Sequence, residues 1–148
     1  MTLIATPVST LYNSKNNINR IIKYSDCLEG RENIETIKNN NIKLIHLDID
    51  IHKTFNKETK ILINNIINNK KLDLLSFQLS SDYYNPLLIK NKYFPKGRKI
   101  SKKYIYKNIK NNFKWLQKKL NKECKVAIEN NNYYKTGAYN LVTNPKFI

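Results

Sequence analysis

Alternation of apolar and polar residues marks five segments of the chain as short β-strands. They span residues 3–8, 24–29, 42–51, 72–80 and 125–131. Between the strands, apolar residues recur at helical spacing in 17–23, 31–39 and 54–69, and again after Ser101, which is a suitable helix N-cap. Strands that alternate with helices are typical of βαβ units. The pattern therefore predicts an α/β fold with a mostly parallel sheet.

One face of each predicted strand is apolar and the other is polar. The polar positions are Glu29 in the second strand, His46, Asp48 and Asp50 in the third with His52 next in phase, Ser76 and Gln78 in the fourth, and Glu129 and Asn131 in the fifth. A sheet with helices on both faces needs strands that are apolar on both. A parallel β/α barrel, with helices outside and catalytic groups at the carboxyl ends of its strands, explains the pattern better. The alternative is an antiparallel sheet with one solvated face, and the intervening helices argue against it.

These polar faces supply the candidate site residues. A carboxylate buried without a partner or a metal is costly, so charged residues collected at strand ends indicate a site. Glu129 is the leading candidate. The further candidates, as pocket residues or additional ligands, are Glu29, His46, Asp48, Asp50, His52, Gln78 and Asn131. For each of them the alternative is a place in a satisfied hydrogen-bond network.

Two segments, 76–86 (SFQLSSDYYNP) and 126–134 (VAIENNNYY), resemble the xylose isomerase-like TIM-barrel superfamily. The segment 136–145 resembles the loop after the fifth strand in uncharacterised bacterial members. The superfamily includes sugar and sugar-phosphate isomerases and epimerases, and repair enzymes of the endonuclease IV type. The resemblance implies one domain over 1–148, an incomplete TIM-type barrel with about five of the family's eight βα units.

The same resemblance implies a metal. In this superfamily the Glu of the fifth strand is typically a ligand for a divalent ion, and here that position is Glu129. A strand-end carboxylate suits Mg, Mn, Fe or Zn. An earlier strand often supplies a His, and the comparable position in this chain is Gln78. An amide is a much poorer ligand, which weakens the case for a site with several metals.

The chain is strongly basic, with 27 Lys and Arg against 11 Asp and Glu and a formal net charge of +16. All the basic residues except Arg20, Arg31 and Arg98 are Lys. Lys lacks the fork with which Arg binds phosphates and guanines. Lys, Asn and Ile, all abundant here, are also read from A/T-rich codons. Nucleic acid is therefore not the favoured partner, although some nonspecific attraction to polyanions follows from the charge.

Cys27 and Cys124 are far apart and show no metal-binding spacing, which predicts reduced thiols and a cytoplasmic protein. The chain has no signal-peptide pattern and no run of about 18 apolar residues, so no membrane partner is expected. With only Gly30, Gly97 and Gly137, it cannot form a local glycine-rich loop that binds phosphate.

A complete barrel needs about 250 residues, and the chain has 148. The leading hypothesis is therefore the amino-terminal part, truncated, of a metal-dependent sugar isomerase or epimerase that acts on a small polar substrate such as a sugar or sugar phosphate. One alternative is an endonuclease IV-like enzyme that contacts nucleic acid through 93–106. Another is a non-catalytic binding module. The open edges of a partial barrel also favour self-association.

Overall fold

A parallel sheet of five strands forms the centre of the computed structural model, which describes residues 4–8, 15–31, 41–69 and 71–144. Along the chain the elements are β1 (Ala5–Pro7), α1 (Lys15–Ile22), β2 (Cys27–Gly30), β3 (Ile42–Asp50), α2 (Lys57–Asn69), β4 (Leu74–Leu79), β5 (Leu87–Ile89), β6 (Lys92–Phe94), α3 (Lys102–Gln117) and β7 (Lys125–Asn130). The predicted α/β fold with a parallel sheet is confirmed. The helix predicted over 31–39 falls almost wholly on residues outside the described ranges.

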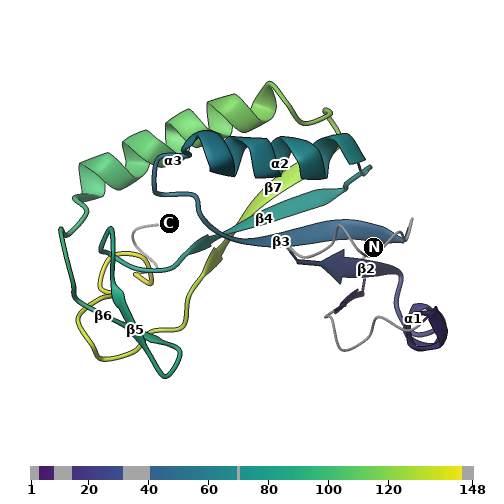
Figure 1. Cartoon of the computed structure of the whole chain (residues 1–148), viewed down its shortest axis with the longest axis horizontal. Coiled ribbons are helices and arrows are strands. Elements are labelled where there is room, and N and C mark those ends of the chain that lie inside the picture. Colours follow the sequence, from purple (N-terminus) through teal and green to yellow (C-terminus); the bar gives the residue numbers. More distant parts are fainter. Residues whose placement is uncertain (1–3, 9–14, 32–40, 70, 145–148) are drawn as a thin grey trace.

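The strands lie in the order β1-β2-β3-β4-β7, which is also their order in the chain, and every pair is parallel. Figure 1 shows α2 and α3 side by side over one face of the sheet, with the β5–β6 hairpin beyond the carboxyl ends of β3 and β4. The sheet is open, with β1 and β7 as its edges among the described strands. Its helix-free face is therefore available to carry polar groups.

The core lies between the sheet and the helices, where the sequence predicts it. On β3 and β4 the alternate apolar residues face the helices and are almost completely buried. The central members of this core are Ile45, Leu47, Leu75 and Phe77 from the sheet, Ile63 from α2 and Leu116 from α3. Burial of one such side chain stabilises the fold by about 1.5–3 kcal/mol. The opposite face of the same strands is free for polar residues.

Both long helices begin at a side chain that caps the first turn. Ser101 accepts the amide of Tyr104, as expected for the predicted N-cap of α3. The helix predicted from residue 54 starts later, at Lys57, because the Asn56 side chain accepts the amide of Thr59 at 2.7 Å. No helix within the described part of the chain is long and apolar enough to cross a membrane.

A bulge interrupts β3 near its carboxyl end. Leu47 pairs with Phe77, but the next pair is Asp50 with Gln78, so that Asp48 and Ile49 have no partner in β4. A bulge disrupts the ladder locally and redirects the side chains around it. Here it turns the Asp48 side chain out to solvent, where 54% of it is exposed.

The segment 82–100, which connects β4 to α3, contains the β5–β6 hairpin. Its two-residue turn places Lys90 and Asn91 at positive φ, which suits a tight hairpin connection. The segment is anchored by Asp82, which is fully buried and accepts the amides of Leu141 and Val142 at 2.9–3.0 Å. These contacts fix the loops beyond the carboxyl ends of the central strands.

Candidate functional site

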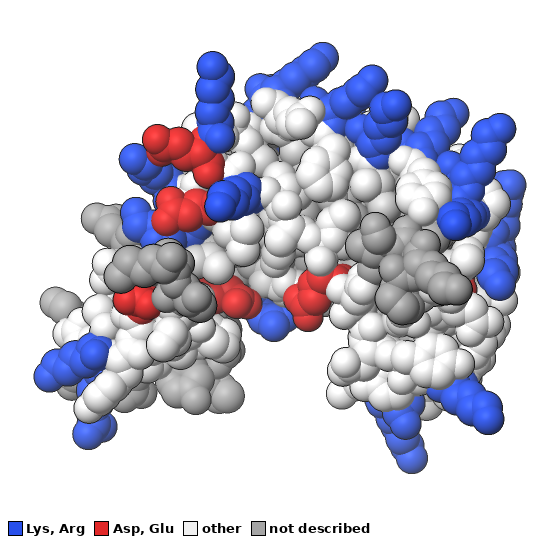
Figure 2. All heavy atoms as spheres, turned by 180° about the vertical axis from the view of Figure 1, so that it is seen from behind, with Lys and Arg blue, Asp and Glu red and all other residues white. Residues whose placement is uncertain are grey.

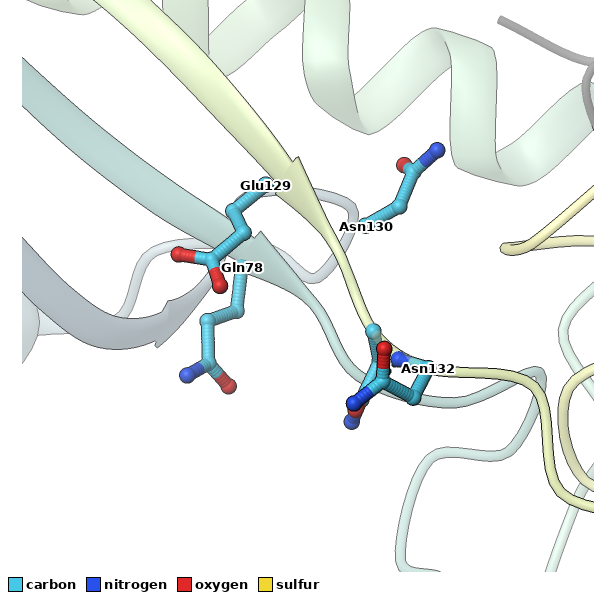
Figure 3. Close-up of a pocket in the computed structure, with 5 residues that line it drawn as sticks. Gln78, Glu129, Asn130 and Asn132 are labelled. Carbon is cyan, nitrogen blue, oxygen red and sulfur yellow. Dashed lines mark hydrogen bonds between the residues drawn. The ribbon is translucent and has the colours of Figure 1, made fainter.

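Polar side chains from three adjacent strands meet on the helix-free face of the sheet. The register places His46 opposite Ser76, and Gln78 opposite Glu129. A pocket of about 70 Å³ opens beside them, lined by Gln78, Glu129, Asn130, Asn131 and Asn132. Figure 3 shows the Glu129 and Gln78 side chains on the same side of the sheet, with Asn130 turned the other way. The pocket thus lies at the carboxyl ends of β4 and β7.

His46 is the centre of this group. Its side chain is only 4% exposed, and each ring nitrogen has polar neighbours. Nδ1 lies 3.0 Å from Glu129 Oε2 and 2.9 Å from the Ser76 hydroxyl. Nε2 lies 3.1 Å from the Gln78 amide nitrogen and 3.4 Å from Asp48 Oδ1. A single buried imidazole therefore connects two carboxylates that come from different strands.

The neighbours of the imidazole differ at its two nitrogens. The Gln78 amide nitrogen donates to Asp48 Oδ1 at 2.7 Å and lies 3.1 Å from His46 Nε2. At Nδ1 the hydrogen-bond partner is the Ser76 hydroxyl, and the Glu129 carboxylate lies beside the same nitrogen as an ion-pair contact. This contact sets Glu129, a side chain that is 60% exposed, against the buried ring.

Arg31, directly after β2, completes the outer side of the group. Its guanidinium lies 3.5 Å from Asp48 Oδ1, and both side chains are about half exposed. The pair is a surface ion pair of the kind that contributes little to stability. Its effect is to place a cation at the rim of an otherwise acidic group.

Asp50 belongs to a second, more buried cluster. It accepts the Ser80 amide at 2.9 Å, the Ser80 hydroxyl at 2.7 Å and the Lys53 amine at 2.7 Å. Burial raises the pKa of Asp50, but His52, Lys53 and the hydrogen bonds from Lys53 and Ser80 outweigh it and hold that pKa below its ordinary value. Three donors from the protein hold this carboxylate, only 16% of the side chain is exposed, and Asp50 does not line the pocket beside Glu129.

His52 is fully buried rather than part of an open polar face. Its Nε2 donates to the Ser81 carbonyl at 2.9 Å, while Nδ1 lies 3.6 Å from Asp50 Oδ1 and has no hydrogen-bond partner in the described structure. Burial lowers the pKa of His52, against the attraction of Asp50. The chain turns inwards directly after the bulged end of β3, which the strand periodicity could not reveal.

The two remaining predicted residues lie apart from His46. Asn131 lines the pocket, and its amide donates to the Ser80 carbonyl at 3.5 Å. Glu29 is half-buried on β2, where its backbone pairs with Leu44. No hydrogen bond joins its side chain to the His46 group among residues whose positions the structure describes. The structure thus brings His46, Asp48, Gln78 and Glu129 together and leaves Glu29 outside.

Some members of the site were not predicted as such. Ser76, which contacts His46, shares the period of Gln78 on the polar face, and that alternation is the signal that could have identified it. Asn130 and Asn132 follow Glu129 directly. Arg31 could have been found as the cation that comes immediately after a predicted strand.

The donors present do not form a closed metal site. Across the described ranges, no group of three or more His, Cys, Asp and Glu side chains is arranged to hold an ion. Asp48 and Glu129 lie at opposite nitrogens of the His46 ring and are therefore held apart. Glu129 could contribute one oxygen to an ion, but a typical site for Zn or Fe needs several protein ligands.

The charge around the site is acidic although the chain is basic. Figure 2 shows Asp and Glu side chains on both sides of the notch at the lower edge of the molecule, with a Lys or Arg side chain between them, whereas most Lys and Arg side chains project from the helical side and from the ends of the molecule. An acidic notch repels phosphates. No family model, curated protein or solved structure matches the chain.

Proposed function

We propose that the helix-free face of the sheet binds a small polar molecule and that Glu129, oriented by His46, moves a proton on it. The observation that carries this proposal is the contact of 3.0 Å between the buried His46 ring and the exposed Glu129 carboxylate. One carboxylate oxygen is held by the ring, and the pocket borders the rest of the side chain. A positioned carboxylate beside a polar pocket is a common form of general base.

The reaction class that fits is isomerisation or epimerisation of a hydroxy-carbonyl compound such as a sugar. Because acidic side chains surround the pocket, an uncharged sugar fits it better than a sugar phosphate. Glu129 would remove a proton from the carbon next to the carbonyl, leaving an enediolate. Return of the proton to the same carbon gives the epimer, and its return to the neighbouring carbon, with transfer of the hydroxyl proton to the former carbonyl oxygen, gives the isomer. No atom is gained or lost overall. The side-chain amides of Gln78, Asn131 and Asn132 offer donors and acceptors for substrate hydroxyls.

The proposed architecture is part of a TIM-type barrel. Strands in chain order, parallel pairing and helices on one face are the features of consecutive βα units. In barrels of this type the carboxyl ends of the strands carry the active site. The position of Glu129 and Gln78 near the ends of β7 and β4 is consistent with that arrangement.

A divalent ion is the second candidate ligand. Glu129 is the residue that would hold it, and its large exposed fraction leaves room for a hydrated ion such as Mg²⁺, which is often bound through one or two carboxylates. Calorimetric titration with Mg²⁺ or Mn²⁺ tests this separately. Stoichiometric binding that is lost in Glu129→Gln would support Glu129 as a metal ligand. Equal binding by the wild type and by Glu129→Gln would exclude Glu129 as a ligand.

A nuclease-like function is less well supported because the notch is acidic. Proton abstraction can be tested directly by solvent deuterium exchange. The protein would be incubated in D₂O with a panel of aldoses, ketoses and their phosphates, and NMR would measure deuterium at the carbon beside the carbonyl. We expect exchange that Glu129→Gln reduces by about 10²-fold or more.

The matched control is Glu123→Gln, which makes the same change at a carboxylate that is 79% exposed and contacts only Lys71 among its described neighbours. This variant should exchange deuterium at the wild-type rate. Equal rates for wild type and Glu129→Gln would contradict the proposal. Binding of a panel member without any exchange would instead favour a non-catalytic binding module.

A further inference from the structure

β7 has one lateral edge that no described strand covers. On its other side it pairs with β4, and the Lys125 amide donates to the Asp73 carbonyl at 2.9 Å. In a parallel ladder, alternate residues direct their backbone groups to the same neighbour. Lys125, Ala127 and Glu129 therefore face β4, while Val126 and Ile128 direct their N–H and C=O groups outwards.

The apolar layer beside this edge is also incomplete. Val126 and Ile128 of β7 are only half-buried, in contrast to Leu75 and Phe77 at the adjacent positions of β4, which are fully buried. An uncovered strand edge next to half-exposed apolar side chains is a template for pairing with another strand.

We propose that this edge pairs with β7 of a second copy of the chain, antiparallel and centred on Ala127. The sequence from Lys125 to Glu129 is self-complementary in this register. Ala127 lies opposite the partner's Ala127, Val126 opposite the partner's Ile128, and Lys125 opposite the partner's Glu129. Because a two-fold axis relates the two copies, the ion pair and the apolar pair each occur twice in the interface.

The backbone supports this register. Val126 and the partner's Ile128 both direct their backbone groups across the seam and exchange two hydrogen bonds, and the symmetry-related pair exchanges two more. A shift of the centre to Val126 retains such pairing but places Glu129 opposite the partner's Glu123. A shift to Ile128 places Glu129 opposite the partner's Ala127. Of these three registers, only the one centred on Ala127 places opposite charges opposite each other.

Pairing would place the partner's Lys125 beside Glu129, so each copy contributes a cation to the other's candidate site. The inference rests on the strand edge and does not depend on the proposed proton transfer. The net charge of +16 on each copy opposes association. Added salt should screen that repulsion, so the salt dependence of dimer formation reports mainly on the net charge of the two copies. Exchanging the charges at Lys125 and Glu129 tests the proposed register more directly.

Sedimentation velocity over a range of protein concentrations, at one ionic strength, would measure the association. We expect the wild type to form dimers. Lys125→Glu and Glu129→Lys should each weaken association by about tenfold or more, because each places like charges opposite each other at two symmetric positions. The double variant should recover the wild-type association. Lys114→Glu, which alters the net charge as much as Lys125→Glu on the exposed side of α3, should not weaken it.

A disulfide test is independent of the charges. With Cys124→Ser as background, Ala127→Cys should form a disulfide-linked dimer on oxidation, because directly opposed residues of a non-hydrogen-bonded pair have Cα atoms about 4.5 Å apart. Lys125→Cys is the control. In the proposed register this position lies opposite the partner's Glu129 and not opposite the partner's residue 125, so the two introduced thiols are too far apart to cross-link. A wild type that stays monomeric, a double variant that does not recover, or equal cross-linking at both positions would overturn the proposal. Circular dichroism would verify that each variant is folded.

Discussion

β3 and the turn after it carry two histidine–carboxylate pairs, and their surroundings differ. His46 lies between two carboxylates that are more than half exposed, beside an open pocket. His52 and Asp50 lie in the protein, with Ser80 and Lys53 bound to the carboxylate. The same residue types therefore form a candidate site in one place and a structural cluster in the other. Exposure and the direction of the hydrogen bonds separate the two.

The largest effect is expected from removing the buried carboxylate. Asp50→Ala should lower the free energy of unfolding by about 2–4 kcal/mol, because it leaves the Ser80 groups and the Lys53 amine without their acceptor. Urea denaturation followed by circular dichroism measures this. If the loss were below about 0.5 kcal/mol, a range typical of surface changes, Asp50 would not have the structural role assigned to it.

The pH dependence of stability should come from the buried histidine. Burial lowers the pKa of His52 below its ordinary 6.5, against the opposing attraction of Asp50. Between the folded pKa and 6.5 the unfolded chain binds more protons than the folded chain, so stability falls as the pH drops through that window. Urea denaturation at several pH values measures the slope.

His52→Gln retains a donor for the Ser81 carbonyl and cannot titrate, so this variant should flatten the pH dependence below 6.5. Lys53 and Asp82 also act on His52, and both are retained in the variant. An unchanged slope would assign the pH dependence to other groups.

The smallest effect is expected at the exposed rim of the candidate site. Arg31→Gln should alter the free energy of unfolding by about 0.5 kcal/mol or less, because the ion pair with Asp48 is half exposed. Urea denaturation, run beside Asp50→Ala, gives the contrast between the two clusters. A loss comparable to that of Asp50→Ala would show that the rim is part of the stabilising framework.

Much of the fold could be predicted because strand periodicity is a local signal. Alternation alone predicts the polar face that carries His46, Gln78 and Glu129, and the register brings these residues together. The placement of His52 could not be predicted, because it depends on a contact with Ser81, 29 residues away. Contacts at that range depend on register and loop path, which the pattern of one segment does not contain.

The bulge in β3 has a consequence for how this strand can change in length. It adds two residues, Asp48 and Ile49, relative to β4. Because side chains alternate with a period of two, a pair of extra residues leaves Asp50 and Ile51 on their original faces. Loss of a single codon here would turn Asp50 towards the helices and Ile51 towards solvent. During evolution this strand can therefore gain or lose residues in pairs, whereas a single deletion would exchange its buried and exposed faces.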